Sequence, residues 1–555
     1  MSSCSKRPKV TKTIDLNRMY KPVKPVRNII VGAGPAGVQL AYFFKKAGID
    51  YVILERNQMA GSFFDRYPHT GQLISINKRH TGSDNDDFKL RHDWNSLLSD
   101  DGPKFTDYSK DYYPDSKDLV RYINDFAKKY ELNIQYNSRV EKIRKFEKGG
   151  YVLAVEEGDK KWVYRCERLI IATGMGVPDM GGGGLIDNSV RKCKHYAEFE
   201  KDYFKKPENL KKYENKNVLI IGNGNSGFEL ANHLTPYAAK IDVMGNRPKK
   251  WASVTHYAGD LRSIYMPFFD TFLLKSLNAF DTYPYNIQKV ISQDTETSPY
   301  TLSQKCSSKT CTEKHNVYPV TFDEVILCTG WKFDESIFDF EVPLFGKYPL
   351  ITPKFESTDS PGLFFIGSLM HGPDHKKSSG GFIHGFRYLI QHFFHINYDG
   401  KLDIVKFNSN SVPALVNHII YRINNSSAIY QMYGQLADIF IWDPVKKDIV
   451  YMNGVHREFI QSESKDTTLT YFVLTLEFSD DQVTDVYKIG ERTTHVGTES
   501  NSKLLHPILR VLKKDQDGRY EKIDIVHFDE DLFADFTDKK RYADKLTRTL
   551  RMFIS

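Results

Sequence analysis

Glycines recur at two places in this sequence with the spacing of a turn that binds a dinucleotide. The first turn reads Gly32-Ala33-Gly34-Pro35-Ala36-Gly37, and the second reads Gly222-Asn223-Gly224-Asn225-Ser226-Gly227. In such a turn the first glycine allows a tight bend, the second lets backbone N–H groups approach a pyrophosphate, and the third permits close packing of helix on strand. The N-terminus of the following helix then faces the phosphates. Each turn therefore predicts a dinucleotide site.

An acidic residue follows the first turn at the distance expected for a ribose contact. The apolar run 51–54 predicts a second strand, and this strand leads directly into Glu55 and Arg56. A carboxylate at this position accepts hydrogen bonds from the ribose hydroxyls of a bound dinucleotide. We expect Glu55 and Arg56 to border the ribose of the first cofactor.

The second turn is followed by basic residues instead of an acid. The strand predicted over 240–244 leads into Gly245-Asn246-Arg247-Pro248, with Lys249 and Lys250 next. A carboxylate would repel a 2′-phosphate, whereas a guanidinium can bind it through two hydrogen bonds. This pattern predicts NADP(H) rather than NAD(H), with Arg247 as the phosphate ligand. The alternative is that Arg247 is a solvated surface base.

Two dinucleotide sites in one chain favour a particular kind of redox protein. A dehydrogenase with one nicotinamide cofactor needs a single turn of this kind, whereas a flavoprotein that a nicotinamide reduces needs two. We therefore predict that the first site holds FAD and the second holds NADP(H).

Three further apolar runs end in small residues. They are "LIIATG" (169–174), "VILCTG" (325–330) and "GLFFIGS" (362–368), and each predicts a buried strand followed by a turn. We expect these turns to pass close to the cofactors, at Gly174, Gly330, Gly367 and Ser368. The glycine-rich segment 378–388 then predicts a helix whose N-terminus faces the flavin.

These elements predict an α/β protein with two Rossmann-like dinucleotide-binding domains, the NADP fold being inserted in the FAD fold, and a C-terminal α+β region. The predicted segments are a basic flexible leader (1–27), the two parts of the FAD domain (28–174 and 331–404), the NAD(P) domain (175–330) and a C-terminal accessory domain (405–555). A chain of 555 residues is too long for one core, which agrees with this division.

Composition excludes several other functions. Residues 1–28 carry eight Lys or Arg and one Asp, which accounts for the whole net charge of +7, so the rest of the chain offers no basic excess for nucleic acid. No run of about eighteen apolar residues could form a transmembrane segment. The six cysteines form no C-x-x-C, and we predict no metal site. Cys306 and Cys311 could form a surface disulfide or remain two free thiols.

The order of these motifs resembles that of the two-dinucleotide-fold flavoproteins, which include flavin-containing monooxygenases and thioredoxin-reductase-like enzymes. Longer stretches resemble one branch of that family, the endoplasmic-reticulum flavoproteins linked to disposal of misfolded glycoproteins. The stretches are "GSFFDRYPHTGQLISINKRHTG" (61–82), "LRHDWNSLL" (90–98), "WASVTHYAGDLR" (251–262), "KKSSGGFIHGFRY" (376–388), "AIYQMYGQLAD" (428–438) and "LLHPILR" (504–510). The similarity covers residues 27 to 530, including much of the C-terminal region.

The resemblance implies non-covalent FAD, an NADP-type fold and a place in the endoplasmic-reticulum lumen. It also implies a role in endoplasmic-reticulum-associated degradation, through non-native protein clients and a thioredoxin-like partner. Three features depart from the pattern. The leader is basic and polar, and the chain ends in "RTLRMFIS" instead of a Lys-Asp-Glu-Leu-like signal, so a cytoplasmic location is the alternative. Ser368 stands where many relatives place an Asp toward the ribityl chain of the flavin.

Three classes of activity remain open. A monooxygenase would use Asn77 to position O₂ or the nicotinamide amide, and His195 and Phe199 match half of a monooxygenase signature; the other half is missing at Ser189 and Arg191. Asn77 could equally cap a turn. A disulfide reductase would need a cysteine relay, which the absent C-x-x-C does not supply. In a binding scaffold, residues 405–555 would be a client-docking domain, although they could also be a lid over the flavin or a dimer surface.

A few polar residues have weaker interpretations. Asn424 and Asn425 form overlapping N-x-S sequons, which matter only in a secretory compartment. His371 and His375 lie four residues apart, but the Gly-Pro between them argues against a metal pair on a helix. His384 lies near the expected flavin, and a packed histidine with satisfied hydrogen bonds is favoured over one that tunes the flavin.

Overall fold

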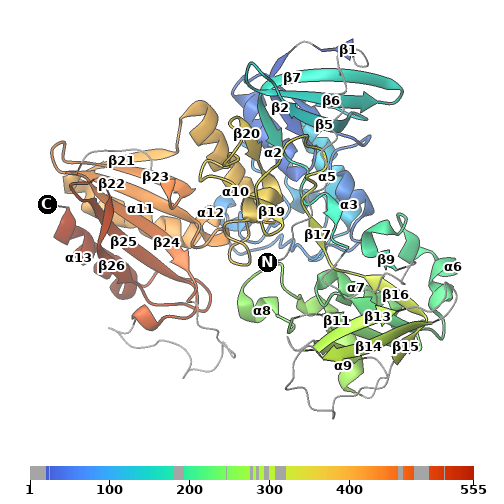
Figure 1. Ribbon diagram of the computed structural model, residues 1–555. Coiled ribbons are helices and arrows are strands. Elements are labelled where there is room, and N and C mark those ends of the chain that lie inside the picture. Colours follow the sequence, from blue (N-terminus) through green and yellow to red (C-terminus); the bar gives the residue numbers. More distant parts are fainter. Residues whose placement is uncertain are drawn as a thin grey trace, which may run out of the picture.

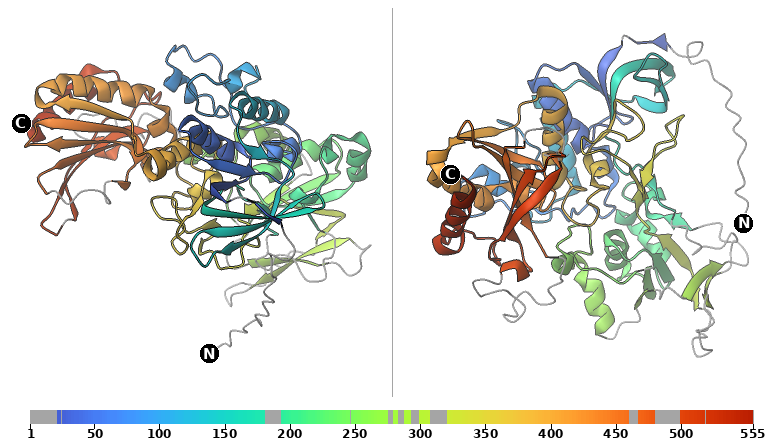
Figure 2. Two further views of the ribbon diagram at one scale, coloured as in Figure 1. Left: turned by 90° about the horizontal axis from the view of Figure 1, so that it is seen from above. Right: turned by 60° about the vertical axis from the view of Figure 1, so that its left-hand side comes forward.

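The computed structural model describes residues 21–23, 25–180, 193–245, 247–274, 279–282, 287–292, 299–306, 320–459, 467–479, 499–517 and 519–554. Three lobes are visible in Figure 1: one coloured blue to teal, one green, and one orange to red at the left of the view. The views in Figure 2 show the orange-to-red lobe, built from the end of the chain, projecting to one side of the other two.

The first lobe is built on a sheet with the order β4-β3-β2-β7-β6-β5, and β20 also pairs with β7. Its parallel strands are β2 (Val26–Val31), β3 (Tyr51–Leu54), β4 (Ile134–Gln135), β7 (Lys160–Ile171) and β20 (Leu363–Phe365), and β5 (Arg139–Lys145) and β6 (Tyr151–Glu157) extend it as an antiparallel pair. Buried parallel strands read as continuous apolar runs, as Ile29–Val31 do. Strand β20 follows the second lobe in the chain and pairs with β7 of the first lobe. This pairing confirms that the NADP fold is inserted in the FAD fold.

Two helices lie against this sheet. Helix α2 (Pro35–Lys46) follows β2 directly, and α10 (Ile383–Phe394) packs beside it. The phenyl ring of Phe43 on α2 stacks on that of Phe394 on α10, with ring centroids 5.4 Å apart. The glycine-rich segment before α10 therefore lies on the same side of the sheet as the first glycine turn.

The second lobe contains a parallel sheet with the order β12-β11-β10-β16-β9. The strands are β9 (Lys194–His195), β10 (Asn217–Ile221), β11 (Lys240–Gly245), β12 (Ala279–Thr282) and β16 (Glu324–Leu327). An antiparallel sheet of β13 (Ile287–Ser292), β14 (Tyr300–Cys306) and β15 (Val320–Phe322) comes between β12 and β16 in the chain. Helix α7 (Asn225–Leu234) begins immediately after Gly224.

The third lobe is the predicted α+β region. Its antiparallel sheet has the order β21-β23-β22-β24-β25-β26, from β21 (Ile404–Asn408), β22 (Leu436–Asp443), β23 (Asp448–His456), β24 (Thr470–Glu477), β25 (His506–Lys514) and β26 (Tyr520–His527). Helices α11 (Val412–Asn425) and α13 (Asp544–Phe553) contact each other, and their apolar faces share one buried core with the sheet.

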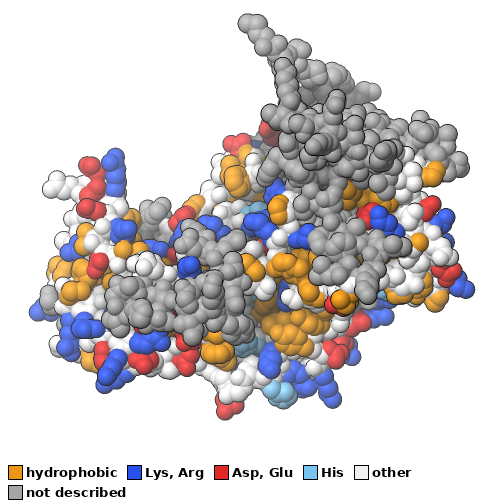
Figure 3. Space-filling view, turned by 90° about the horizontal axis from the view of Figure 1, so that it is seen from below, with side chains coloured by type: hydrophobic (Ala, Val, Ile, Leu, Met, Phe, Trp, Pro, Cys, Tyr) orange, Lys and Arg blue, Asp and Glu red, His pale blue; other side chains and the backbone are white. Residues whose placement is uncertain are grey.

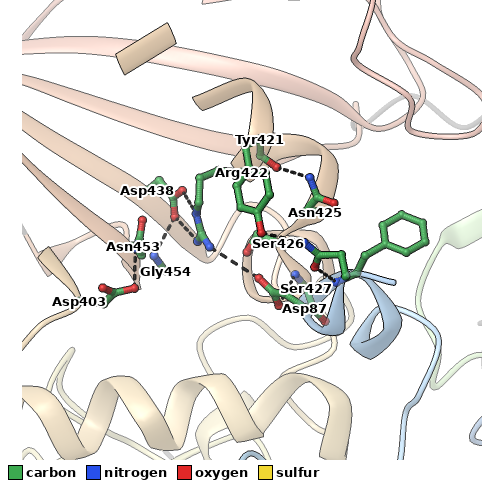
Figure 4. Close-up of polar contacts among 12 residues, drawn as sticks. Asp87, Asp403, Tyr421, Arg422, Asn425, Ser426, Ser427, Asp438, Asn453 and Gly454 are labelled. Carbon is green, nitrogen blue, oxygen red and sulfur yellow. Dashed lines mark hydrogen bonds and ion pairs between the residues drawn. The ribbon is translucent and has the colours of Figure 1, made fainter. Parts of the chain in front are cut away.

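Buried charges anchor this lobe to the first one (Figure 4). Arg422 donates from Nε and Nη2 to the two carboxylate oxygens of Asp438, at 2.6 and 2.9 Å, and Asp438 is fully buried. Arg422 Nη1 also lies 3.7 Å from the carboxylate of Asp87, which belongs to α4 (Asp86–Leu90) of the first lobe. The backbone N–H of Ser427 donates to the same Asp87 carboxylate at 3.0 Å. These contacts fix where the C-terminal lobe sits.

The two sequons lie at the end of α11, inside this junction. Ser426 and Ser427 are fully buried, and Oδ1 of Asn424 accepts a hydrogen bond from the backbone N–H of Phe536 at 2.8 Å. Asn424 and Asn425 themselves are half-buried, so only the serines of the two sequons are fully enclosed. No helix within the described ranges combines the length and the hydropathy of a membrane span.

Candidate functional site

The two glycine turns have the same backbone geometry. Gly32 and Gly222 adopt φ angles of +105° and +118°, in the region that favours glycine. A Cβ atom at Gly37 would lie 2.0 Å from the carbonyl oxygen of Gly32, and a Cβ at Gly227 would lie 2.0 Å from that of Gly222. The first and third positions of both turns therefore require glycine for steric reasons.

The middle glycine of each turn faces open space at a helix N-terminus. No atom lies within 4 Å of the Cβ position of Gly34 or Gly224, which are the N-caps of α2 and α7. Neither helix has a side-chain cap or an acidic residue in its first turn. The first N–H groups and the positive end of each helix dipole are therefore available to an anion. The open space in front of each of these helix N-termini, here called a cradle, fits the pyrophosphate of a dinucleotide.

Glu55 is held against the first turn. Its side chain is buried, and Oε2 accepts a hydrogen bond from the backbone N–H of Ala33 at 2.8 Å. Oε1 accepts from the backbone and the side chain of Asn57 at 2.9 and 2.8 Å. A carboxylate has about four acceptor sites, so Oε2 can still accept from a ribose hydroxyl. Arg56 follows it in the chain and is exposed.

The predicted turns after β7 and β20 meet at the start of α2. Gly174 and Gly367 have φ angles of +65° and +73°. A Cβ at Gly367 would lie 2.6 Å from Cβ of Ala36, and one at Gly174 would lie 3.4 Å from Oγ of Ser368. Residues from three distant parts of the chain, including Pro35 and Ala36 in the first turn of α2, therefore converge on one place. Their contact with a cofactor stays a prediction.

The predicted residues of the second site surround the second turn. Asn223 donates from Nδ2 to the carbonyl oxygen of Arg247 at 2.7 Å, and Arg247 itself is exposed. Asn225 has a structural role that the sequence did not reveal, because its amide bonds the backbone of Gly259, Asp260 and Arg262. Ser226 lies in the first turn of α7. Gly330, with φ +86°, has open space at its Cβ position.

The pyridine nucleotide-disulphide oxidoreductase model matches residues 29–367, which span both glycine turns and the β20 return. The chain belongs to this family. It is 35% identical over 551 residues to FAD-dependent oxidoreductase domain-containing protein 2 of Mus musculus, covering 92% of this chain and 81% of the mouse protein. The protein of that name in Danio rerio is 29% identical, with 94% and 82% covered. The probable indole-3-pyruvate monooxygenase YUCCA9 of Arabidopsis thaliana is 26% identical over 37% of this chain and 44% of its own.

As a member of this family, the chain is a flavin-dependent oxidoreductase that binds FAD and NADP(H). The cradles at Gly34 and Gly224, each in front of an uncapped helix, suit these two cofactors. The individual contacts of each side chain with FAD or NADP(H) remain predictions.

Asn77 is buried between segments of the first lobe of this oxidoreductase. Nδ2 donates to the carbonyl oxygens of Ser109 and Asp111 at 2.9 and 3.2 Å. Oδ1 is also buried and has no hydrogen-bond partner among the described residues. A turn cap would use Oδ1 as its acceptor, so the cap interpretation does not describe Asn77. An orphaned acceptor such as Oδ1 is available to a donor from a bound molecule.

The prediction for His384 is wrong in one respect. The ring is packed as expected, 4.2 Å from the ring of Trp94 and 1% exposed, but neither ring nitrogen has a hydrogen-bond partner among the described residues. Burial lowers the pKa of His384 well below its ordinary value, so the imidazole is neutral. The sequence could not reveal this, because burial of the ring depends on Trp94, far away in the chain.

Other histidines have structural partners. His195 accepts from the backbone N–H of Ala197 at its Nδ1, 3.0 Å away, and so caps a turn before the buried Phe199. His371 and His375 contact the hydroxyl groups of Tyr257 and Tyr348 at 3.1 and 3.2 Å. In the part of the chain that the structure describes, no group of three His, Cys, Asp or Glu side chains is placed to hold a metal.

Glu229 is a buried carboxylate that the sequence analysis missed. It lies on α7 and accepts hydrogen bonds from the backbone N–H and the hydroxyl of Thr70, at 3.2 and 2.9 Å, and from the hydroxyl of Tyr196 at 3.0 Å. No cation pairs with it in the described structure, and burial raises its pKa from 4.5 to about 7. In the sequence, the sign of this buried carboxylate was its position between the apolar residues Phe228 and Leu230. Glu229 connects the two dinucleotide lobes.

The described cysteine side chains are poorly suited to redox relay. Cys166, Cys193 and Cys328 are free. Burial raises the pKa of Cys166 and Cys193 to about 12, and it also raises that of Cys328, so the reactive thiolate form is suppressed. The question of a Cys306–Cys311 disulfide falls outside the described side chains.

Proposed function

We propose that this oxidoreductase passes electrons from NADPH through FAD to an acceptor. The observation that carries the proposal is the pair of matched glycine turns, each with open space in front of an uncapped helix. The bound FAD and nicotinamide would supply the hydride and electron transfer. The chain's own contribution is to bind both cofactors and orient them.

We assign residues to each cofactor from this geometry. The FAD site would comprise Gly32, Gly34, Pro35, Ala36, Gly37, Glu55, Arg56, Gly174, Gly367 and Ser368. The NADP(H) site would comprise Gly222, Gly224, Asn225, Ser226, Gly227, Arg247 and Gly330. Glu55 would orient the FAD ribose, and Arg247 would select for a 2′-phosphate.

We propose further, from the family resemblance, that the acceptor is a disulfide in a thioredoxin-like partner in the endoplasmic-reticulum lumen. NADPH and one proton would reduce that disulfide to two thiols. The protein would then serve degradation of misfolded proteins. Similarity to FAD-dependent oxidoreductase domain-containing protein 2 over 92% of the chain supports this proposal. Because Cys166 and Cys328 are buried and Cys193 is half-buried with a raised pKa, the partner's disulfide would have to approach the flavin itself.

A monooxygenase is the second candidate, and Asn77 is the observation that favours it. Its buried Oδ1 has no hydrogen-bond partner within the described ranges, and its Nδ2 group is fixed by the carbonyl oxygens of Ser109 and Asp111. A fixed amide of this kind could orient the nicotinamide amide near the flavin, or O₂. The resemblance to the probable indole-3-pyruvate monooxygenase supports the same class.

Anaerobic stopped-flow absorbance separates these possibilities. The purified holoprotein is mixed with NADPH, and the visible band of oxidised flavin is followed. We expect rapid loss of the band with NADPH and slower loss with NADH. Reoxidation is then compared between O₂ and an oxidised thioredoxin-like protein. If neither nucleotide reduces the bound flavin, the redox proposal fails and a flavoprotein scaffold that binds non-native proteins replaces it.

A further inference from the structure

A cavity of about 370 Å³ lies where the C-terminal lobe meets both dinucleotide lobes. We call it the junction chamber. The first lobe contributes Trp94, the second contributes His256 and Arg262, and the C-terminal lobe contributes Tyr430, Tyr433 and Phe478. Small-molecule sites in proteins have volumes of about 300–1,000 Å³ and often lie between domains. None of the residues assigned individually to a cofactor lines this chamber, although Ser379 does, and it belongs to the glycine-rich segment predicted to face the flavin.

The walls of the junction chamber are fixed by contacts between the lobes. The imidazole of His256 stacks on the ring of Phe478, with centroids 3.9 Å apart and planes at 9°. The hydroxyl of Tyr433 donates to the carbonyl oxygen of His256 at 3.2 Å. Gln431 Nε2 donates to the carbonyl oxygen of Arg91 at 2.6 Å, and the guanidinium of Arg91 lies 4.5 Å from the ring centroid of Tyr430. The chamber is therefore a built feature of the folded chain.

Figure 3 shows the face of the molecule that lies at the bottom of Figure 1, near α8 (Ala252–Thr255). Hydrophobic side chains gather in the middle of this face, beside the C-terminal lobe. The chamber lining includes Ser253, which is exposed at the start of that segment. A ligand could therefore enter from solvent.

Charge in the chamber has one sign. Arg262 is its charged lining residue, and burial lowers the pKa of His256, which keeps that ring neutral at pH 7. The guanidinium of Arg262 lies 5.2 Å from the ring centroid of Trp94, and Nη1 donates to the carbonyl oxygen of Ile74 at 2.8 Å. In the described structure, Nε and Nη2 of Arg262 make no hydrogen bond and no carboxylate pairs with the guanidinium. Those N–H groups can bind an anion.

We propose that the junction chamber binds a small aromatic carboxylate. The aromatic rings supply flat apolar surface for the body of the ligand, and Arg262 supplies the partner for its carboxylate. The C-terminal lobe thus completes a ligand site that the dinucleotide lobes do not form alone. This inference concerns binding only, and it does not depend on the electron acceptor of the proposed function.

Isothermal titration calorimetry of the full-length holoprotein tests the proposal. The probes are 2-naphthylacetate and its neutral counterpart, 2-naphthylacetamide, each titrated with and without saturating NADP⁺. A hydrogen bond to a charged group contributes about 1.5–3 kcal/mol, so the carboxylate should bind about tenfold more tightly than the amide, or better. NADP⁺ should leave that affinity unchanged. Loss of probe binding with NADP⁺ present would make the chamber part of the nicotinamide site and overturn the proposal.

Two variants locate the bound probe. Arg262→Met should abolish the preference for the carboxylate, because the guanidinium is lost, and leave the amide affinity within about twofold, because methionine keeps an apolar side chain at this position. Ser253→Trp should block both probes by filling the entrance, from an exposed position that makes no hydrogen bond with Arg262. Arg121→Met, at an exposed arginine of the first lobe, is the matched control and should bind like the unmodified protein. The proposal is wrong if Arg262→Met keeps the preference or Ser253→Trp binds both probes normally.

Discussion

Alanine at the third glycine of each turn provides a matched experiment on the two cofactor sites. In Gly37→Ala the new Cβ would lie 2.0 Å from the carbonyl oxygen of Gly32, and in Gly227→Ala it would lie 2.0 Å from that of Gly222. Real Cβ atoms essentially never come within 3.0 Å, so helix and turn must separate by at least 1.0 Å. Both neighbours are backbone atoms, so no side-chain rotation relieves the clash.

The expected losses follow from that displacement. Overpacking of this kind costs about 1–3 kcal/mol, and each 1.4 kcal/mol is about tenfold in affinity, so the affected cofactor should bind about 5- to 150-fold more weakly. Gly37→Ala should release FAD, measured as free flavin fluorescence after gel filtration. Gly227→Ala should keep FAD and lose NADP⁺, measured by calorimetry. Each loss should be confined to one cofactor because the turns belong to different sheets.

Gly48→Ala is the control. It follows α2 with a φ of +67° and open space at its Cβ position, so it introduces backbone strain of about 1–2 kcal/mol without moving the first turn. It should lower stability but keep both affinities. The reasoning is refuted if Gly227→Ala releases FAD and retains NADP⁺, or if Gly37→Ala binds both cofactors normally.

Three further predictions concern charge. Arg247→Ala should weaken the binding of NADPH about 10- to 100-fold and hardly change the binding of NADH. Lys250→Ala, at an exposed lysine, is the control and should change neither affinity much. Equal losses of affinity for NADPH and NADH after Arg247→Ala would remove the 2′-phosphate assignment. Burial raises the pKa of Glu229 from 4.5 to about 7. As the pH rises, the carboxyl of Glu229 therefore loses its proton in the unfolded chain before it does so in the folded chain. The free energy of unfolding should fall by up to about 3 kcal/mol between pH 4.5 and 7. Glu229→Gln should remove that fall in urea titrations, and an unchanged pH profile would contradict the assignment. Asp438→Asn leaves Arg422 without its bidentate partner and should destabilise the C-terminal lobe by about 3–5 kcal/mol. Faster hydrogen exchange of backbone amides in that lobe would measure this loss. Asp100→Asn, which breaks an exposed ion pair with Lys46, is the control and should cost under about 1 kcal/mol.

The glycine turns show why some of the site could be predicted. A strand, a tight turn and a helix form one continuous segment, so the spacing of Gly32, Gly34 and Gly37 specifies the bend, the open cradle and the close packing without distant residues. The same holds for Gly222 to Gly227. The return of β20 to the first sheet was also predictable, because a short apolar run ending in glycine fits few other places in such a fold.

Side-chain environments were harder to predict because they depend on distant segments. Glu229 reads as one more polar residue of a helix until Thr70 and Tyr196 are placed around it. His384 was expected to have hydrogen-bond partners, yet its ring packs on Trp94 and its nitrogens have none in the part of the chain that the structure describes. Asn225 was predicted as a cofactor contact, and its amide also holds the loop at Gly259.

The sequence by itself specified the two dinucleotide turns and the order of the lobes, because those features arise from neighbouring residues. Which cofactor each turn holds stays a prediction. Only the tertiary structure decided where the C-terminal lobe lies and that it closes a chamber with Arg262 inside. The position of the C-terminal lobe depends on contacts such as those of Asp87 with Ser427 and of His256 with Phe478. These residues are far apart in the chain, and no local pattern specifies that they meet.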